Sequence, residues 1–262
     1  MDGHIFDPEG RYARHLILPE IGPAGQARLN AASVLVIGAG GLGSPVLLYL
    51  AAAGVGRITV IDPDRVEASN LQRQVIHADA RLGWPKVASA AAAMRALNPF
   101  VEVRPDARRL TEANAPGLLA DCDLILDGTD NFDTRYLVNR AAVAARTPLI
   151  AGAIAQWEGQ VSLYDPARGG PCFECVFPVR PAPGLVPSCA EAGVVAPLPG
   201  IVGSIMAVEA IKHLTGAGAS LRGVLLIQDA LWGETRRISL KPRADCPVCG
   251  GRGRLDGTAA IA

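Results

Sequence analysis

Glycines at a characteristic spacing are the first sign of chemistry in this chain. The pattern Gly-x-Gly-x-x-Gly follows the apolar run 34–37 and is formed by Gly38, Gly40 and Gly43. A loop without side chains lets the backbone approach a phosphate, and the N–H groups of a following helix supply donors and positive potential. Asp62 lies 24 residues after Gly38, near the spacing at which an acid binds a ribose hydroxyl. These residues predict a nucleotide site, which an NAD-dependent oxidoreductase would also satisfy.

The side chains that follow Asp62 favour phosphate chemistry over hydride transfer. Asp64, Asn70, Arg73 and Lys86 bring mixed charge to the mouth of the predicted site. Two carboxylates beside two cations indicate phosphate together with a metal ion. A hydride-transferring enzyme would leave both cations without a role.

A further acid, Asp130, follows the apolar run 123–127 at the carboxyl end of a predicted strand. Ligands bind at this end of the strands in open α/β sheets, so Asp130 is a candidate site residue. Its structural alternative is the N-cap of a helix over 131–146.

Six cysteines divide into two pairs and two single residues. Cys172 with Cys175 and Cys246 with Cys249 form two C-x-x-C pairs 70 residues apart, and four thiolates suit a tetrahedral structural zinc. A redox pair or free buried thiols are the alternatives, and a reducing cytosol disfavours disulfides. Cys122 precedes an apolar strand and reads as a packing residue. Cys189, in a proline-rich loop over 178–199, is a candidate nucleophile or a dispensable loop cysteine.

The elements that must position these residues alternate between strand and helix through the first 150 residues. This alternation predicts an α/β fold, a Rossmann-like, mostly parallel sheet with helices on both faces. The segments 159–164, 222–228 and 235–240 alternate like antiparallel strands that extend the sheet, and a helix is expected over 200–214. The other predicted strands cover 34–37, 57–61, 101–104 and 123–127; the other predicted helices cover 44–53, 85–97 and 131–146, with one more beginning near Thr111.

Composition limits the possible classes of protein. The 262 residues are 50% hydrophobic and carry no net charge, which suits one compact enzyme and argues against nucleic acid or an anionic membrane as partner. The uncharged run 34–56 is long enough to span a bilayer, but its glycines favour a buried strand, turn and helix. The acidic N-terminus does not resemble a signal peptide, so we expect a cytoplasmic protein.

Several motifs occur in order: RYAR at 11–14, GAGGLGS at 38–44, IDPD at 61–64, SNLQRQ at 69–74, WPK at 84–86, GTDN at 128–131 and CPVC at 246–249. With them the chain resembles the ThiF/MoeB/HesA family, the bacterial relatives of ubiquitin-activating enzymes. The resemblance implies ATP-dependent adenylation of the C-terminal glycine carboxylate of a small ubiquitin-like sulfur carrier ending in Gly-Gly. Pyrophosphate is released, and the carrier then receives sulfur as a thiocarboxylate. The molybdopterin-synthase branch is the closer match, and the thiamine branch is the alternative.

The same resemblance assigns roles to individual residues. Arg73 and Lys86 clamp phosphate, Asp130 holds magnesium, the four paired cysteines hold zinc, and Cys189 remains open. Arg14 implies a homodimer, because the matching arginine reaches the ATP site of the neighbouring protomer. A sulfur donor, either a cysteine desulfurase or a rhodanese, is a further expected partner. The expected nucleotide contacts are Gly38, Gly40, Gly41, Gly43, Asp62, Asp64, Ser69, Asn70, Leu71, Gln72, Arg73, Lys86, Asp130 and Asn131.

The expected organisation is one compact unit with four parts. An N-terminal helical segment covers 1–32, the ATP-binding part 33–152, a C-terminal part with the zinc site 153–250, and a disordered tail 251–262. The attacking carboxylate is already ionised, so the reaction needs positioning and charge rather than a general base. His77, close to the predicted clamp, is therefore expected to be a hydrogen-bonding loop residue. A non-catalytic scaffold would be expected to lose the clamp residues, all of which are present.

Overall fold

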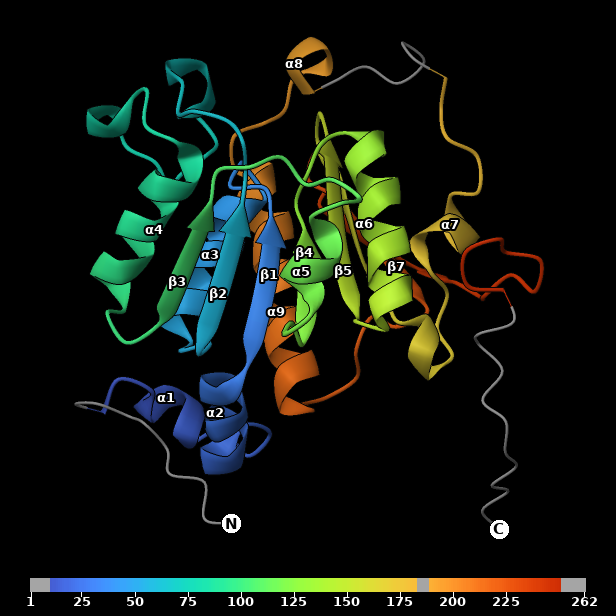
Figure 1. Cartoon of the computed structure of the whole chain (residues 1–262), viewed down its shortest axis with the longest axis horizontal. Coiled ribbons are helices and arrows are strands. Elements are labelled where there is room, and N and C mark those ends of the chain that lie inside the picture. Colours follow the sequence, from blue (N-terminus) through green and yellow to red (C-terminus); the bar gives the residue numbers. More distant parts are fainter. Residues whose placement is uncertain (1–9, 183–188, 251–262) are drawn as a thin grey trace.

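A single mixed sheet organises the computed structural model, which describes residues 10–182 and 189–250 (Figure 1). Its strand order is β3-β2-β1-β4-β5-β6-β7-β8. The first five strands in this order are parallel, and β6, β7 and β8 continue the sheet in antiparallel pairs. The strands are β1 (Ser33–Ile37), β2 (Arg57–Ile61), β3 (Glu102–Asp106), β4 (Leu124–Asp127), β5 (Leu149–Ala155), β6 (Glu158–Tyr164), β7 (Val224–Asp229) and β8 (Glu234–Ser239).

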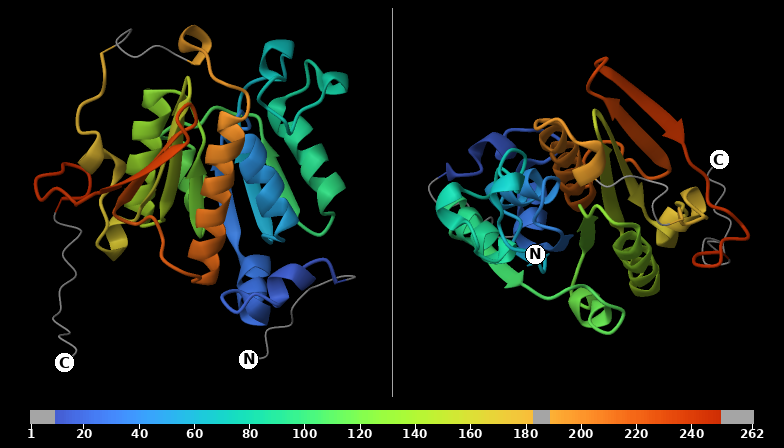
Figure 2. Two further views of the ribbon diagram at one scale, coloured as in Figure 1. Left: turned by 180° about the vertical axis from the view of Figure 1, so that it is seen from behind. Right: turned by 90° about the horizontal axis from the view of Figure 1, so that it is seen from above.

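Helices cover both faces of the parallel half. The longer helices α3 (Gly43–Ala52), α4 (Lys86–Leu97) and α9 (Leu198–Thr215) pack on one face, whereas α5 (Ala115–Leu119) and α6 (Phe132–Ala145) pack on the other (Figures 1 and 2). α7 (Phe173–Val176) lies beside α6, and α8 (Cys189–Ala192) lies beyond the carboxyl ends of the parallel strands. At the opposite end of these strands lie α1 (Ala13–Leu16) and α2 (Gly22–Ala31).

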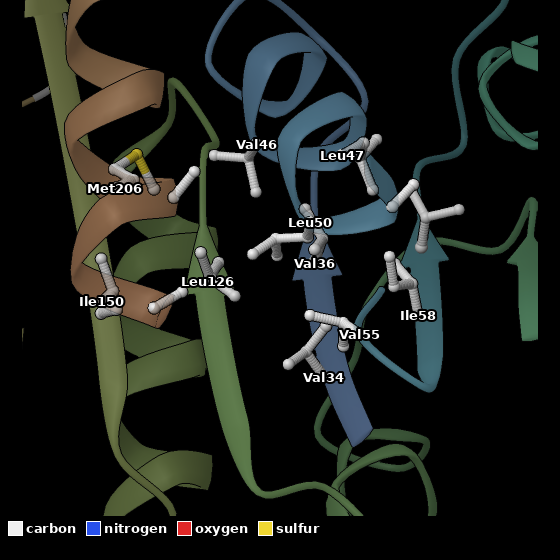
Figure 3. Close-up of a cluster of buried hydrophobic side chains, with 14 of the residues drawn as sticks. Val34, Val36, Val46, Leu47, Leu50, Val55, Ile58, Leu126, Ile150 and Met206 are labelled. Atoms are coloured by element: carbon white, nitrogen blue, oxygen red, sulfur yellow. The ribbon is translucent and has the colours of Figure 1, made fainter. Parts of the chain in front are cut away.

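Strand β1 is buried along its whole length because its side chains serve two cores. Val34 and Val36 point into the larger core against α3 and α9, where Leu50 and Met206 also lie (Figure 3). Leu35 and Ile37 alternate with them and join the second core under α5 and α6. The near-continuous apolar run of a parallel strand follows from burial on both faces.

The predicted fold class is confirmed, with local corrections. The helix expected near Thr111 begins later, because the Thr111 hydroxyl accepts a hydrogen bond from the Asn114 N–H in a turn and α5 starts at Ala115. Strand β5 was not predicted, and the expected boundary between residues 152 and 153 falls within it.

The uncharged run 34–56 folds as β1, the glycine loop and α3 rather than as a membrane span. Within residues 10–182 and 189–250, no helix has the length and apolar character needed to cross a membrane. The expected disordered tail over 251–262 lies outside the described residues, as does part of the loop 178–199.

Candidate active site

A cleft of about 390 Å³ opens at the carboxyl ends of the parallel strands, where β1 and β4 lie side by side. The chain runs outward from β1 to β2 and β3, then returns to β4 on the other side of β1. Ligands in open α/β sheets bind at this switch point. Residues from the expected nucleotide site line the cleft, namely Gly38, Gly40, Gly41, Asp62, Asp64, Arg73, Lys86, Asp130 and Asn131.

Glycine is required at different positions of the loop for different structural reasons. Gly38 has a φ of +95°, which favours glycine, and its N–H donates to the Ile61 carbonyl at 2.9 Å. A Cβ on Gly43 would lie 2.0 Å from the Gly38 carbonyl oxygen, so this glycine permits the tight turn into α3 and lies outside the described lining of the cleft. Gly41 lines the cleft, but a Cβ there would meet Pro199 of α9 at 3.1 Å. Gly41 therefore also gives room to α9, beside the nucleotide contact expected of it.

Asp62 is held in place at the end of β2. Its Oδ2 accepts a hydrogen bond from the Ala39 N–H at 2.8 Å, and its Oδ1 accepts one from the Asp64 N–H at 2.8 Å. Each carboxylate oxygen retains a further acceptor position. The buried, preoriented acid is therefore suited to accept a ribose hydroxyl.

Two cations of the predicted clamp reach the cleft from different segments. Lys86 opens α4 and is buried, and its Nζ lies 3.0 Å from Asp64 Oδ2. The ammonium has three donors, so two remain after this ion pair. Arg73, in the loop after β2, donates from Nη1 to the Ser69 carbonyl at 3.2 Å and also lines the cleft. Together they place two positive charges beside the glycine loop.

Besides Gly43, four expected nucleotide contacts do not line the cleft in the part of the chain that the structure describes. Ser69, Asn70, Leu71 and Gln72 lie outside its lining. Gln74 lines the cleft instead: it is buried, and its Nε2 donates to Asn70 Oδ1 at 2.8 Å. Its buried Oε1 has no hydrogen-bond partner within the described residues. Asn70 therefore acts on the cleft through Gln74.

The loop after β4 carries the exposed Asp130 and is held by hydrogen bonds on either side of it. Asp130 is exposed and lines the cleft, while Asn131 is the N-cap of α6 and accepts from the Thr134 N–H at 2.9 Å. The capping role considered for Asp130 is thus wrong, which leaves its carboxylate free of that bond. Below it, buried Asp127 accepts from the Thr129 N–H and hydroxyl, at 2.9 Å and 2.7 Å. Burial raises the pKa of Asp127.

Arg135 of α6 supports the same loop. It is buried and donates from Nη2 to the Thr129 carbonyl and, at 2.8 Å, to the Gly152 carbonyl of β5. This guanidinium therefore ties the Asp130 loop to the next strand of the sheet. It was not among the predicted site residues, since an arginine at position 135 within a helix resembles any surface arginine in sequence.

The cleft has a second, apolar end. Phe132, Ile154, Phe173 and Phe177 line it beyond Asp130, where β5 turns antiparallel into β6. None of these residues was predicted as a site residue. Because they come from three separate segments, namely α6, β5 and the turn of α7, no local spacing could have indicated them.

His77 is a hydrogen-bonded structural residue, as predicted. Its Nε2 lies 2.8 Å from the Ala39 carbonyl oxygen and its Nδ1 lies 2.9 Å from Ser89 Oγ. The carbonyl can only accept, so Nε2 carries the proton and Nδ1 accepts from the hydroxyl. Burial lowers the pKa of His77, which keeps the ring neutral.

The two cysteine pairs meet in one buried cluster. The Sγ atoms lie within 4.8 Å of one another, with 3.6 Å between Cys172 and Cys246 and 3.3 Å between Cys175 and Cys249. Zinc–sulfur bonds of about 2.3 Å in a tetrahedron separate the sulfurs by about 3.8 Å, so the cluster fits such an ion. Burial raises the pKa of the Cys172 thiol, and a bound cation is what would hold it as a thiolate.

The other two cysteines differ in how much the structure describes. Cys122 donates from its thiol to the Leu124 carbonyl at 2.9 Å, and burial raises its pKa to about 11, so it is unreactive. Cys189 begins α8, but its side chain lies outside the described residues.

Arg14 lies at the opposite end of the parallel strands from the cleft of its own chain (Figure 1). Its helix is anchored firmly: the Tyr12 hydroxyl accepts from Asn98 Nδ2 at 2.9 Å, and His15 Nδ1 lies 2.9 Å from Oε1 of buried Gln26. Gln26 Nε2 in turn donates to the Ala53 carbonyl at 2.9 Å. The exposed Arg14 therefore lies on a well-anchored helix, at the opposite end of the strands from the cleft of its own chain, and cannot contribute to that cleft.

Comparison with known proteins adds a family to this geometry. The model of the ThiF family matches residues 12–248. A sulfur carrier protein adenylyltransferase of Thermus thermophilus is 52% identical over 244 residues, covering 92% of this chain and 90% of the relative. A SAMP-activating enzyme E1 of Haloferax volcanii is 49% identical over 240 residues, covering 92% and 88%.

A solved structure agrees at the level of the fold. The crystal structure of Escherichia coli MccB with MccA-N7isoASN superposes with a TM-score of 0.83 at 23% identity, covering 93% of this chain and 75% of that one.

Proposed function

Since the chain belongs to the ThiF family, we propose that this adenylyltransferase uses ATP to adenylate the C-terminal glycine carboxylate of a small ubiquitin-like sulfur carrier. One observation carries the proposal. Arg73, Lys86 and Asp130 come from three separate segments and line one cleft with the glycine loop. Two cations and an acid beside a phosphate-binding loop suit a reaction in which a carboxylate attacks a phosphate group.

The chemistry explains why two cations are needed. The carrier carboxylate attacks the α-phosphorus of ATP, an acyl–phosphate bond forms, and pyrophosphate leaves with the electrons of the broken bond. Two unit charges about 4 Å apart repel by roughly 4 kcal/mol at an effective dielectric constant near 20. Arg73 and Lys86 offset this repulsion and are already in place before the substrates arrive.

The remaining cleft residues orient the nucleotide. Asp62 accepts the ribose hydroxyls, and the N–H groups of Gly40 and Gly41, which line the cleft, face the phosphates. Asp130, exposed in the cleft, is the acid that would hold magnesium, and magnesium when bound neutralises charge on the phosphates. Gln74, held by Asn70, completes the polar wall.

The carrier is the second substrate, and its tail needs a route to the phosphate that avoids the nucleotide. The apolar end of the cleft at Phe132, Phe173 and Phe177 offers that route. We assign the carrier to the molybdopterin-synthase small-subunit type. The thiamine-pathway carrier is the competing substrate, and the exchange experiment below includes both.

The position of Arg14 supports a homodimer. A rigidly anchored arginine that cannot reach its own cleft can contribute to catalysis in the cleft of a second copy. Each chain would then supply the glycine loop of one site and the arginine of the other.

The cysteine cluster supports a structural zinc, because four buried thiols at these separations match its preferred ligand set. Such a reduced cluster suits the cytoplasm, where we place the enzyme. A cysteine desulfurase or a rhodanese is the class of protein that would then supply sulfur to the adenylated carrier. Cys189 is assigned no essential part in the adenylation step, which needs no thiol.

The competing function is an NAD-dependent oxidoreductase, for which the glycine loop and Asp62 would suffice. Hydride transfer would give no catalytic role to the buried Lys86 or to Asp130 in the cleft. The two relatives described above are named as an adenylyltransferase and an activating enzyme, which favours the adenylyltransferase over the oxidoreductase.

Pyrophosphate exchange tests the proposal. Labelled pyrophosphate should enter ATP only when a carrier ending in Gly-Gly is supplied, and faster with the molybdopterin-synthase type than with the thiamine type. Arg73→Met should abolish exchange, whereas Arg104→Met, which removes an exposed arginine of β3 outside the cleft, should leave it unchanged. Absence of exchange with every such carrier would refute the proposed function.

A further inference from the structure

The turn over 172–177, which contains the first two cysteines of the cluster, also contributes residues to the lining of the cleft. Phe173 lies between Cys172 and Cys175, is buried, and lines the apolar end of the cleft. Phe177, two residues after Cys175, lines it as well. One short segment therefore supplies ligands to the sulfur cluster on one side and aromatic rings to the cleft on the other.

The rings form a packed aromatic cluster. Phe173 meets Tyr136 edge-on, with ring centroids 5.4 Å apart, and Tyr164 at 5.7 Å. It lies against Phe177 at 4.8 Å. The Tyr136 hydroxyl donates to the Phe177 carbonyl at 2.7 Å. A shift of Phe173 would thus displace Phe177 with it.

Hydrogen bonds tie this turn to α6. The N–H of Phe173 donates to Oδ1 of buried Asn139 at 2.9 Å, and Asn139 Nδ2 donates to Glu174 Oε1 at 3.1 Å. Arg140 pairs with the same carboxylate at 3.1 Å. On this side the turn is well anchored.

On the other side its anchor is the sulfur cluster. α7 has four residues, too few to be stable without outside contacts. Cys172 and Cys175 contact Cys246 and Cys249, and the Arg243 N–H donates to Cys175 Sγ at 3.4 Å. Thiols without a metal make only weak contacts, so a metal ion is what would fix this end of the turn.

We infer that the clustered cysteines, through their metal, position Phe173 and Phe177 as the wall that receives the tail of the carrier protein. The glycine loop follows β1, Asp62 follows β2 and Lys86 opens α4, and none of the bonds described for this turn joins it to these residues. The metal therefore acts on the affinity for the carrier and not on the affinity for ATP. Phe173 and Phe177 are positioning residues for the second substrate, and this role rests on the proposed function.

Separate binding and kinetic measurements test this inference on the full chain. Zinc is removed with a chelator, and dissociation constants for ATP and for the carrier that supports exchange are measured by calorimetry, before and after zinc is restored. We expect metal removal to weaken carrier binding about tenfold, with ATP binding changed less than about twofold and full recovery on restoring zinc. Equal losses for both ligands, or unchanged carrier binding, would overturn the inference.

A variant that keeps the metal makes the test independent of folding. Phe173→Leu should raise the KM for the carrier about tenfold, while zinc content, the KM for ATP and kcat stay near wild type. Phe100→Leu, at an exposed phenylalanine outside the cleft, is the matched control and should change neither KM. An unchanged carrier KM in Phe173→Leu would also overturn the inference. The proposed function fails separately, if the wild type supports no exchange at all.

Discussion

Replacement of Lys86 by methionine tests the electrostatic reasoning most directly, since it removes a buried charge and keeps the length of the side chain. Two anions about 4 Å apart repel by roughly 4 kcal/mol at an effective dielectric constant near 20, and Lys86 shares the task of offsetting this with Arg73. Loss of one of two cations should therefore cost about 2–4 kcal/mol of transition-state stabilisation. Each 1.36 kcal/mol is about tenfold in rate, so exchange should fall about 30- to 1000-fold.

Asp64 provides an internal control for this calculation. In Lys86→Met its carboxylate, 3.0 Å from the lost ammonium, becomes an uncompensated negative charge in the cleft. Because the side chain of Asp64 is 60% exposed, water screens it, and Asp64→Asn should restore exchange by no more than about fivefold.

The assay is carrier-dependent pyrophosphate exchange under saturating ATP, with thermal melting to show that each variant is folded. A folded Lys86→Met enzyme that exchanges within threefold of wild type would refute the reasoning. So would a double variant restored to the full wild-type rate, because the role of Lys86 would then be to neutralise Asp64 alone.

Asp130→Ala should abolish exchange without lowering the melting temperature, since its side chain is exposed; a large drop in melting temperature would contradict this. Cys246→Ser should lower both bound zinc, measured by mass spectrometry, and the melting temperature. Arg14→Ala and Asp130→Ala should each be inactive alone, and mixing them should restore part of the activity if the arginine acts in trans. Burial lowers the pKa of His77 and His213 in the folded protein, so the unfolded chain binds more protons. Stability should thus be complete above the unfolded value near 6.5 and fall as the pH drops below it; His77→Gln should flatten that fall in melting temperature, and an unchanged slope would contradict the assignment.

The parts of the fold that sequence predicts well are those governed by local patterns. The apolar run 34–37 lies in a buried strand, the run 57–61 forms a strand buried at three of its five positions, and the glycine spacing predicts the loop that follows β1. The prediction that Arg73, Lys86 and Asp130 share one cleft depends on the resemblance, because each residue belongs to a motif of that family and no spacing implies that the three lie together.

The missed features depend on contacts between distant segments. β5 went unrecognised because its small residues, LIAGAIA, lack the alternation of a half-buried strand. Gln74 and Arg135 look like ordinary polar residues until the tertiary structure buries them against the cleft. The four residues 69–72 were expected in the cleft as a motif, whereas only the residues after them reach it.

Because β1 is buried on both faces, this strand cannot readily accommodate inserted residues. The glycine loop begins at the residue after β1, and Gly38 and Gly128 are tied to the neighbouring strands by backbone bonds of 2.9 Å and 3.0 Å. A single inserted residue within 33–37 would exchange the residues that face the two cores and displace the loop from both neighbours. The turn joining β7 and β8 is less constrained: the Ala230 N–H donates to the Trp157 carbonyl at 2.9 Å, but β8 itself is exposed throughout. We therefore expect insertions to be tolerated better in β8, at the antiparallel edge, than in the strand that leads into the phosphate loop.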